Sequence, residues 1–422
     1  MSFAPASSLN ETDISRVERF EFSGRQRVDR TVERRDGSEF RTTLKANFDL
    51  EAMEPDMASD LAWLRSTSGP KAAPGSRVIR SVDLFAGCGG LSIGIAEAAR
   101  ALGMDLWPVL ANDIDPAILG IYSRNMPETE IVCAPVESML DGECGTSLTT
   151  SERRLAARLG EIDLLVGGPP CQGHSDFNNH TRNNDPKNEL YLRMARFCEV
   201  VRPQHVIIEN VPGVERDKRQ SAQRTWSILR DLGYSVDSGV TDASRLGVAQ
   251  KRKRSITMAS LDFAPSIKIA ISSLEVKPRP VLWAISDLVD IESDRLIDQS
   301  PNPNGESRRR MDYLFDHDLY ELPDDQRPDC HRLKNHSYTS VYGRLYPDRP
   351  APTITTGFGV MGRGRFVHPT RRRTITPHEA ARIQYFPDYF DFASSSRTVI
   401  QKVIGNAVPP KLGYAIGLHL LR

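Results

Sequence analysis

The fold is decided at Asp83-Leu84-Phe85-Ala86-Gly87-Cys88-Gly89-Gly90-Leu91-Ser92, where the apolar strand 78–85 runs into the Ala-rich helix 91–102. The same alternation continues with expected strands at 106–110, 131–134, 162–166 and 206–209 and expected helices at 116–125 and 190–201. Strands that alternate with helices predict an α/β fold with a mostly parallel sheet covered on both faces. Because such sheets bind ligands at the carboxyl ends of their strands, the segments that follow each strand form the candidate site.

The total charge hides two unlike halves of the chain. The 422 residues carry 55 Lys plus Arg and 55 Asp plus Glu. Residues 81–244 have 15 basic against 23 acidic side chains, whereas residues 245–422 have 27 against 19. The second half therefore offers a local positive field to a polyanion, although the net charge of the chain is zero.

Composition also excludes several classes of protein. No apolar run reaches the roughly 18–20 residues that a membrane span needs, and no signal peptide opens the sequence, so secretion is unsupported. The six cysteines are irregularly spaced, without C-x-x-C pairs or a histidine cluster. This pattern argues against a metal site or a disulfide scaffold and favours the reducing cytoplasm.

Residues 1–75 lie outside the strand–helix rhythm and are expected to be an N-terminal extension and linker. The turn pair Asp36-Gly37 predicts a tight hairpin, residues 50–64 have apolar side chains at helical spacing, and residues 66–76 have the composition of a linker. Two interpretations remain open for this part: a small accessory module, or a partly ordered tail that carries a hairpin.

The first two strand ends indicate a nucleotide-bearing cofactor. Glycines after the first strand allow the backbone to turn sharply and to approach a ligand. The second strand ends at Asn112-Asp113-Ile114-Asp115, where the carboxylate of Asp113 is well placed to accept hydrogen bonds from a ribose diol. We expect Asp115 to cap the helix that follows.

The fourth strand is followed by Gly167-Gly168-Pro169-Pro170-Cys171-Gln172-Gly173. The prolines stiffen this loop and hold Cys171 at its tip, at the ligand-binding edge of the sheet. A thiol in a polar loop at that position favours a nucleophile over an inert packing residue.

The fifth strand and a basic run supply further candidates. Glu209 follows three apolar residues, so we expect it to be partly buried and to have a raised pKa. The run Gln250-Lys251-Arg252-Lys253-Arg254 precedes another strand, and its alternation places Arg252 and Arg254 on one face. That face could point at an anionic or carbonyl-bearing substrate.

In this order, these segments resemble the cytosine-C5 DNA methyltransferases. The resemblance rests on the glycine turn, Pro170-Cys171-Gln172, Glu209-Asn210-Val211 and Gln250-x-Arg252-x-Arg254, and near the end on Arg373-x-x-Thr376-x-x-Glu379, continued by 380–388, and Gly405-Asn406-Ala407-Val408-Pro409-Pro410. It implies a Rossmann-like sheet that binds S-adenosylmethionine, with a catalytic domain at 76–262, a smaller, irregular β-rich target-recognition region at 263–372 and a C-terminal segment at 373–422 that returns to the catalytic domain.

The resemblance also implies roles for single residues. Cys171 is the expected nucleophile on a flipped-out cytosine, Glu209 holds the N3 edge of the base, and Arg252 and Arg254 secure the base and the reacting loop. Contacts with the cofactor are expected from Phe85, Ala86, Gly87, Gly89, Gly90, Leu91, Asp113, Ile114, Pro170, Asn406, Ala407 and Val408. The chain departs from the usual pattern at Ile114, where an aromatic residue is common, and at His174, where phenylalanine is usual.

Target choice is expected to lie in the basic second half. Glycines at 357, 359, 362 and 364 alternate with Arg363 and Arg365 in a segment that could follow a DNA groove. With Gln172 and Ser175 of the cysteine loop, these arginines are the expected DNA contacts. Double-stranded DNA is the expected partner, in a bacterial cytoplasm at the nucleoid. Two possibilities stay open for the enzyme: it is paired with a restriction endonuclease acting on the same site, or it acts alone.

Three alternatives remain for the function. The first is the same chemistry on tRNA, and the second is a catalytically silent DNA-binding homologue. The third is a nucleotide-binding enzyme with a redox cysteine, which would transfer no methyl group to nucleic acid. The basic glycine-arginine segment favours duplex DNA over tRNA, and the presence of Cys171, Glu209 and Arg254 argues against a silent homologue.

Overall fold

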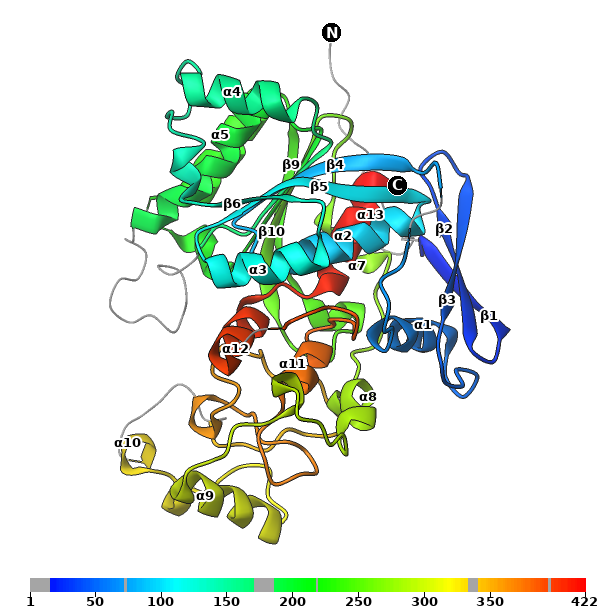
Figure 1. Ribbon diagram of the computed structural model, residues 1–422, viewed down its shortest axis with the longest axis vertical. Helices are drawn as coiled ribbons and strands as arrows, with labels where there is room; N and C mark the ends of the chain where they lie inside the picture. Colours follow the sequence, from blue (N-terminus) through cyan, green and yellow to red (C-terminus); the bar gives the residue numbers. More distant parts are fainter. Residues whose placement is uncertain (1–15, 72–73, 171–185, 218, 333–340, 394–395) are drawn as a thin grey trace.

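The computed structural model describes residues 16–71, 74–170, 186–217, 219–332, 341–393 and 396–422. Its centre is a seven-stranded sheet in the order β6-β5-β4-β7-β8-β10-β9 (Figure 1). The strands are β4 (Arg77–Leu84), β5 (Met104–Asp113), β6 (Glu130–Cys133), β7 (Leu164–Gly167), β8 (His205–Asn210), β9 (Ser235–Asp242) and β10 (Lys253–Ser260). Strands β4 to β8 pair in parallel, whereas β10 is antiparallel to β8 and β9. The predicted α/β fold is confirmed.

Helices cover both faces of this sheet because its strands are apolar on both sides. On one face, Val166 and Ile207 pack with α2 and α13; on the other, Leu165 and Ile208 pack with the second group of helices. The helices of the first face are α2 (Gly90–Ala101) and α13 (Pro410–Leu421), and those of the second are α4 (Thr150–Leu159), α5 (Leu192–Val201) and α6 (Ser221–Asp231).

The order of the strands places the site. From β4 the chain continues outward through β5 and β6, and it then returns to β7 on the other side of β4 before continuing through β8. The loops after β4 and β7 therefore leave neighbouring strands in opposite directions. Such a switch point opens a crevice at the carboxyl edge of a parallel sheet.

The N-terminal residues form a folded accessory module, which decides between the two interpretations for the described residues 16–65. It consists of an antiparallel sheet and one helix: β1 (Glu18–Gly24), β2 (Arg27–Glu33), β3 (Glu39–Lys45) and α1 (Pro55–Leu64). The predicted hairpin joins β2 to β3, with Gly37 at φ 81°. The expected helix begins at Pro55 and not at residue 50, because proline suits the first turn of a helix.

The lobe built from residues 263–372 differs from the β-rich region that we expected. Its helices are α8 (Val281–Ile285), α9 (Gly305–Asp316) and α10 (Asp329–Arg332), whereas α7 (Ile267–Ser272) packs with α13 against the seven-stranded sheet. Within the described part of this range there are isolated β-bridges, such as Arg344 with Val367, and no strand. Frequent prolines, among them Pro347, Pro350 and Pro352, remove the backbone donors that a β-ladder requires.

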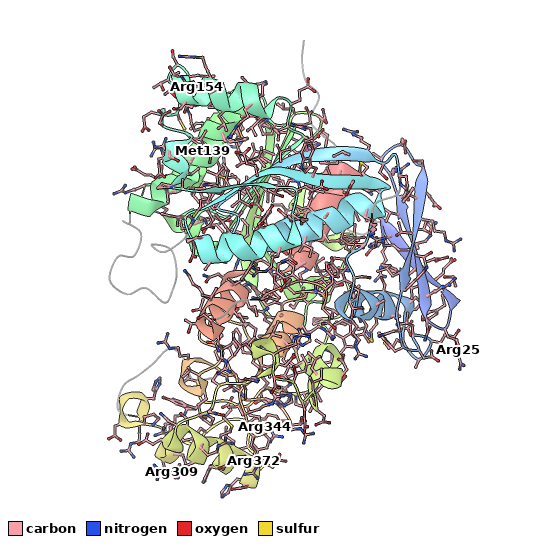
Figure 2. All side chains as sticks on the ribbon, in the orientation of Figure 1. Arg25, Met139, Arg154, Arg309, Arg344 and Arg372 are labelled. Carbon is pink, nitrogen blue, oxygen red and sulfur yellow. The ribbon has the colours of Figure 1, made fainter. Side chains whose placement is uncertain are left out.

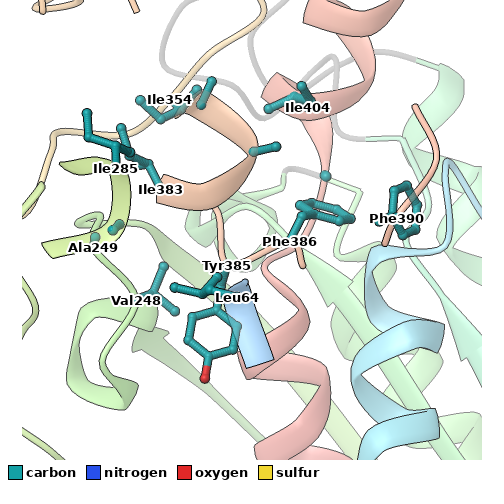
Figure 3. Packing of buried hydrophobic residues seen from close by; sticks show 14 of the residues in the cluster. Leu64, Val248, Ala249, Ile285, Ile354, Ile383, Tyr385, Phe386, Phe390 and Ile404 are labelled. Atoms are coloured by element: carbon teal, nitrogen blue, oxygen red, sulfur yellow. The ribbon is translucent and has the colours of Figure 1, made fainter. Parts of the chain in front are cut away.

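A shared core joins this lobe to the rest of the molecule (Figure 3). Leu64 of the N-terminal module, Val248, Ile285, Ile354 and Ile404 are all buried in one cluster, although they come from five distant parts of the sequence. The last two helices of this junction are α11 (Pro377–Ile383) and α12 (Arg397–Asn406). Across the parts of the chain that the structure describes, no helix is long and apolar enough to cross a membrane.

Candidate functional site

The glycine loop after β4 turns through a run of left-handed backbone conformations. Phe85, Gly87 and Gly89 have φ values of 55°, 56° and 87°. The amide of Ala86 donates to the carbonyl of Asn112 at 2.9 Å, and the amide of Gly87 donates to Oδ2 of Asp113 at 3.0 Å. The loop is thereby tied to the end of β5, and α2 begins directly after it at Gly90.

The end of β5 presents a carboxylate and an exposed apolar side chain. Oδ1 of Asp113 accepts from the amide of Asp115 at 3.1 Å, so this carboxylate is fixed by backbone donors on both sides. Ile114 is 69% exposed. Asp115 caps α3 (Pro116–Asn125) by accepting from the amides of Ala117 and Ile118, which confirms the predicted cap.

The C-terminal segment completes this side of the site. A Cβ atom on Gly90 would lie 2.5 Å from the carbonyl oxygen of Val408, so the segment after α12 rests directly on the start of α2. Asn406 is exposed beside it, and Ala407 is buried. Lys402 of α12 reaches across to Asp115 in an ion pair of 2.7 Å. Three segments that are distant in sequence therefore lie together at this edge of the sheet.

A hydrogen-bonded group lies beneath the glycine loop and was not assigned a role from the sequence. Ser92 donates to Oδ2 of buried Asp83 at 2.6 Å, and Tyr122 donates to Ser92 at 3.4 Å. Burial raises the pKa of Asp83 to about 8, against the hydrogen bonds from Ser92 and Tyr122. A largely neutral Asp83 supports the loop without adding a second charge beside Asp113. In the sequence, only the position of Asp83 at the start of the stretch 83–92 could have indicated this role.

The loop that leads to the expected nucleophile begins beside the fifth strand. The side chain of Asn210 donates to the carbonyl of Pro169 at 3.1 Å, and a Cβ atom on Gly168 would lie 3.5 Å from Oε2 of Glu209. Pro170 is partly buried at the last described position before the loop. Cys171, Gln172, His174 and Ser175 lie outside the described residues.

Glu209 and Arg254 form a largely buried ion pair where β8 ends and β10 begins. Nε of Arg254 lies 2.6 Å from Oε1 of Glu209, and the two side chains are only 12% and 11% exposed. Glu209 is held on β8 and Arg254 on β10, so a rigid antiparallel strand pair fixes their separation. Burial raises the pKa of Glu209, although the charge of Arg254 opposes this shift. Glu209 can hold a proton, and Arg254 can donate hydrogen bonds, at the polar edge of a bound ring.

Arg252 lies close enough to Glu209 for its charge to oppose the rise in the pKa of that carboxyl. Its side chain is 1% exposed and donates to the carbonyls of Ile354 at 2.9 Å and Gly405 at 3.0 Å. Arg252 precedes the regular strand, because β10 begins only at Lys253. Beside it, buried Gln250 accepts from the amide of Ile354 at 2.6 Å. Both side chains hold the second lobe and α12 against the sheet.

The two arginines of the glycine-arginine segment have different surroundings. Arg363 is exposed at the end of the short 3-10 helix Met361–Arg363. Arg365 is 6% exposed and donates to the carbonyls of Tyr320 and Arg344 at 2.8 and 3.0 Å, with Glu321 as a third partner. Arg365 is therefore occupied inside the lobe, and the expectation that it reaches DNA is not supported. Figure 2 shows Arg309, Arg344 and Arg372 in the same lobe.

Known proteins resemble this chain over nearly its whole length. Residues 79–422 match the family of C-5 cytosine-specific DNA methylases. The Type II methyltransferase M1.BsuMI of Bacillus subtilis is 45% identical over 96% of this chain and 95% of its own length. The Type II methyltransferase M.XorII of Xanthomonas oryzae is 30% identical over 81% of this chain and 84% of its own length.

Solved structures share the fold. The Dnmt2 methyltransferase of S. pombe superposes with a TM-score of 0.57 over 81% of this chain and 98% of its own, at 21% identity. The methyltransferase EhMeth of Entamoeba histolytica superposes with a TM-score of 0.55 over 82% of this chain and 98% of its own, at 18% identity. With the family match and the similarity to M1.BsuMI, these findings establish that the chain belongs to the C-5 cytosine-specific DNA methylases and is a DNA cytosine-5 methyltransferase.

Proposed function

We propose that this enzyme binds S-adenosylmethionine at the switch point and methylates cytosine in a specific duplex DNA sequence, with Cys171 as nucleophile and Glu209 and Arg254 as base-binding residues. The observation that carries the proposal is the buried Arg254–Glu209 pair, 2.6 Å apart, beside the start of the loop that leads to Cys171. Addition to a cytosine ring requires a nucleophile and an acid held in a fixed position. Both would lie at one edge of the sheet here.

The residues around the glycine loop fit the cofactor. Asp113 is held by backbone donors with its carboxylate toward the strand end, where a ribose diol would bind, and exposed Ile114 offers an apolar surface to an adenine ring. Phe85, Ala86, Gly87, Gly89, Gly90 and Leu91 would line one side, and Pro170, Asn406, Ala407 and Val408 the other. When bound, S-adenosylmethionine supplies a methyl group on a sulfonium centre.

The chain's own residues would prepare the base for that methyl group. The thiolate of Cys171 adds to C6 of cytosine, and the electron pair displaced from the C5–C6 bond makes C5 nucleophilic. A proton held by Glu209 at N3 stabilises the charge that moves onto the ring, and Arg254 fixes the carboxyl group in place. After methylation, a base such as water takes the C5 proton, the electron pair of the C5–H bond re-forms the C5–C6 double bond, and the bond between C6 and sulfur breaks, which returns the thiolate. Because the ring must be reached from its face, the base has to leave the duplex.

DNA contacts would come from the second lobe and the cysteine loop. Exposed Arg363 is the arginine of the glycine-arginine segment that remains available, and Gln172 and Ser175 follow the nucleophile in the sequence. Since both bacterial relatives are named Type II methyltransferases, we place the enzyme in a restriction-modification system, with an endonuclease that cuts the same site. Its place of work would then be the bacterial nucleoid, in the cytoplasm.

The test is transfer of tritiated methyl groups from S-adenosylmethionine to unmethylated genomic DNA, followed by bisulfite sequencing. We expect methylation at C5 within one sequence context and none on tRNA. Cys171→Ala should abolish turnover while S-adenosylmethionine still binds, and Arg363→Ala should weaken DNA binding without changing cofactor affinity. Full activity of the Cys171→Ala enzyme would refute the assigned nucleophile.

A further inference from the structure

The N-terminal module lies outside the residues that match the methylase family, yet it packs on the helices that begin at the cofactor site (Figure 1). Strands β2 and β3 contact α2, and α1 lies beside β1 to β3. The contacts between this module and the sheet are not limited to apolar side chains. Two groups of buried charges join the module to α2 and α13.

The first group centres on Arg30 of β2, which is 4% exposed. Its Nη1 lies 2.9 Å from Oε1 of Glu97 on α2 and 3.3 Å from the hydroxyl of Tyr414 on α13. Tyr414 in turn donates to Oε2 of Glu18 on β1 at 2.5 Å. Burial works to raise the pKa of Glu97, but Arg100 and Arg30 hold it below its ordinary value. One guanidinium therefore binds both helices at the same time.

The second group repeats this arrangement from the helix of the module. Lys411, in the first turn of α13, lies 2.8 Å from Oδ1 of Asp60 on α1, and Tyr385 donates to the same oxygen at 2.5 Å. Asp60 and Lys411 are both buried. Two elements of the module thus hold α13 at separate points along its length, and one of them also holds α2.

The spacing between α2 and α13 matters because the helices touch through their backbones. A Cβ atom on Gly94 would overlap the carbonyl oxygen of Pro410, and one on Gly413 would lie 2.6 Å from the carbonyl oxygen of Leu91. The helices begin at Gly90 and Pro410, directly after the two segments proposed to enclose the cofactor. A shift of one helix along the other would therefore separate Val408 from Gly90.

We propose that the N-terminal module is a clamp that sets the position of α13 against α2, and that Arg30, Tyr414 and Lys411 are positioning residues for cofactor binding. The inference rests on the proposed cofactor site. An unpaired charge left in this interface would be costly, so the helices would move to admit water or another partner. Such a movement would lower the affinity for the cofactor and would leave the groups that touch the base in place.

The test compares Tyr414→Phe and Arg30→Met with Arg196→Met in the full-length enzyme. Arg196 is a matched control because it is fully buried and paired with Glu152 at 2.6 Å, on the opposite face of the sheet. We expect the two clamp variants to raise the Kd for S-adenosylmethionine by about fivefold or more, with kcat at saturating cofactor little changed. Arg196→Met should lower the melting temperature while its Kd stays near that of the wild type. Tyr414→Phe removes a single hydroxyl and keeps the experiment informative if Arg30→Met does not fold.

Hydrogen exchange provides a readout that does not depend on the cofactor. Each variant is measured at the same number of degrees below its own melting temperature. Under this condition, amides of residues 86–95 and 405–412 should exchange faster in Tyr414→Phe and Arg30→Met than in Arg196→Met. Equal exchange in all three variants would overturn the clamp. Absence of cofactor binding by the wild type would instead refute the proposed site, and exchange would still decide for or against the clamp.

Discussion

At the scale of single residues, the chemistry depends on how each charge is surrounded. Glu209 and Arg254 are adjacent on paired strands, and both are largely removed from water. Arg363 and Arg365 are two positions apart, yet one is exposed and the other is held by two carbonyls and a carboxylate. Residue type alone does not separate these cases, because an arginine can bind a ligand or stabilise a loop with the same five donors.

Glu209→Gln is predicted to lower kcat by about 100-fold or more, because the amide cannot transfer a proton to N3. Burial raises the pKa of Glu209, so the carboxyl keeps its proton to a higher pH than an exposed glutamate and loses it as the pH rises through that pKa. The descending limb in a profile of kcat against pH should therefore be absent from Glu209→Gln.

The matched control is Glu152→Gln, a buried carboxylate that is also paired with an arginine. It should reduce stability and leave the pH profile unchanged. An unaltered descending limb in Glu209→Gln would show that another group titrates there.

At the scale of elements, glycines decide which helices can touch. Gly94 of α2 faces the backbone of α13 at Pro410, whereas a Cβ atom on Gly120 of α3 would meet nothing within 4 Å. Both are interior glycines of helices that flank the same site. Only the first therefore has a packing reason to be glycine.

Gly94→Ala is predicted to destabilise the protein by about 1–3 kcal/mol, because the added methyl group forces α2 and α13 apart. Gly120→Ala is the control and should stabilise α3 by about 0.5–1 kcal/mol through helix propensity. Urea denaturation measures both changes in the free energy of unfolding. Equal effects of the two substitutions would show that the helix contact is not tight in solution.

At the scale of the whole molecule, a charged cluster joins the two lobes next to the shared core. Nδ1 of His378 lies 2.7 Å from Asp298 of the second lobe, and its Nε2 lies 2.9 Å from Asp388. Carboxylates accept hydrogen bonds, so both ring nitrogens donate and the imidazole is charged. Asp388 also binds Arg382, which reaches Asp287 at 3.2 Å.

His378→Gln is predicted to reduce the pH dependence of stability above the unfolded pKa of histidine, about 6.5. Burial works to lower the pKa of His378, but hydrogen bonds to Asp298 and Asp388 raise it above its ordinary value. A raised pKa means that the ion pairs stabilise the folded state fully below the unfolded pKa of about 6.5, and that this contribution is lost as the pH rises through the folded pKa.

The measurement is the free energy of unfolding of both proteins, from urea denaturation at a series of pH values from below about 6.5 upward. The advantage of the wild type over His378→Gln should be about 1–2 kcal/mol at the acidic end and should shrink as the pH rises through the folded pKa. A constant difference at every pH would exclude titration of His378 as its source.

The sequence by itself determined the α/β fold, the strands β4 to β8 in their order along the chain, the glycine loop and the acidic side chains at the ends of β5 and β8, whereas β9 was not predicted. These features follow from local periodicity and from short motifs, since strand, turn and cap preferences are set within about ten residues. The hairpin at Asp36-Gly37 and the cap at Asp115 were correctly predicted for the same reason.

Only the tertiary structure decided which charges meet. Arg252 and Arg365 were predicted to contact ligands, but carbonyls from residues 320 to 405 occupy them. The wrong expectation of a β-rich second lobe has the same origin, because residues 263–372 carry no strong local period. The hairpin and the helix of residues 16–65 were visible in the sequence, but only packing against the sheet decided that they form one folded module. Long-range contacts such as Arg30 with Glu97 join residues that no sequence pattern relates. Packing across the whole chain selects them, since a buried charge must find its partner wherever the fold brings one close.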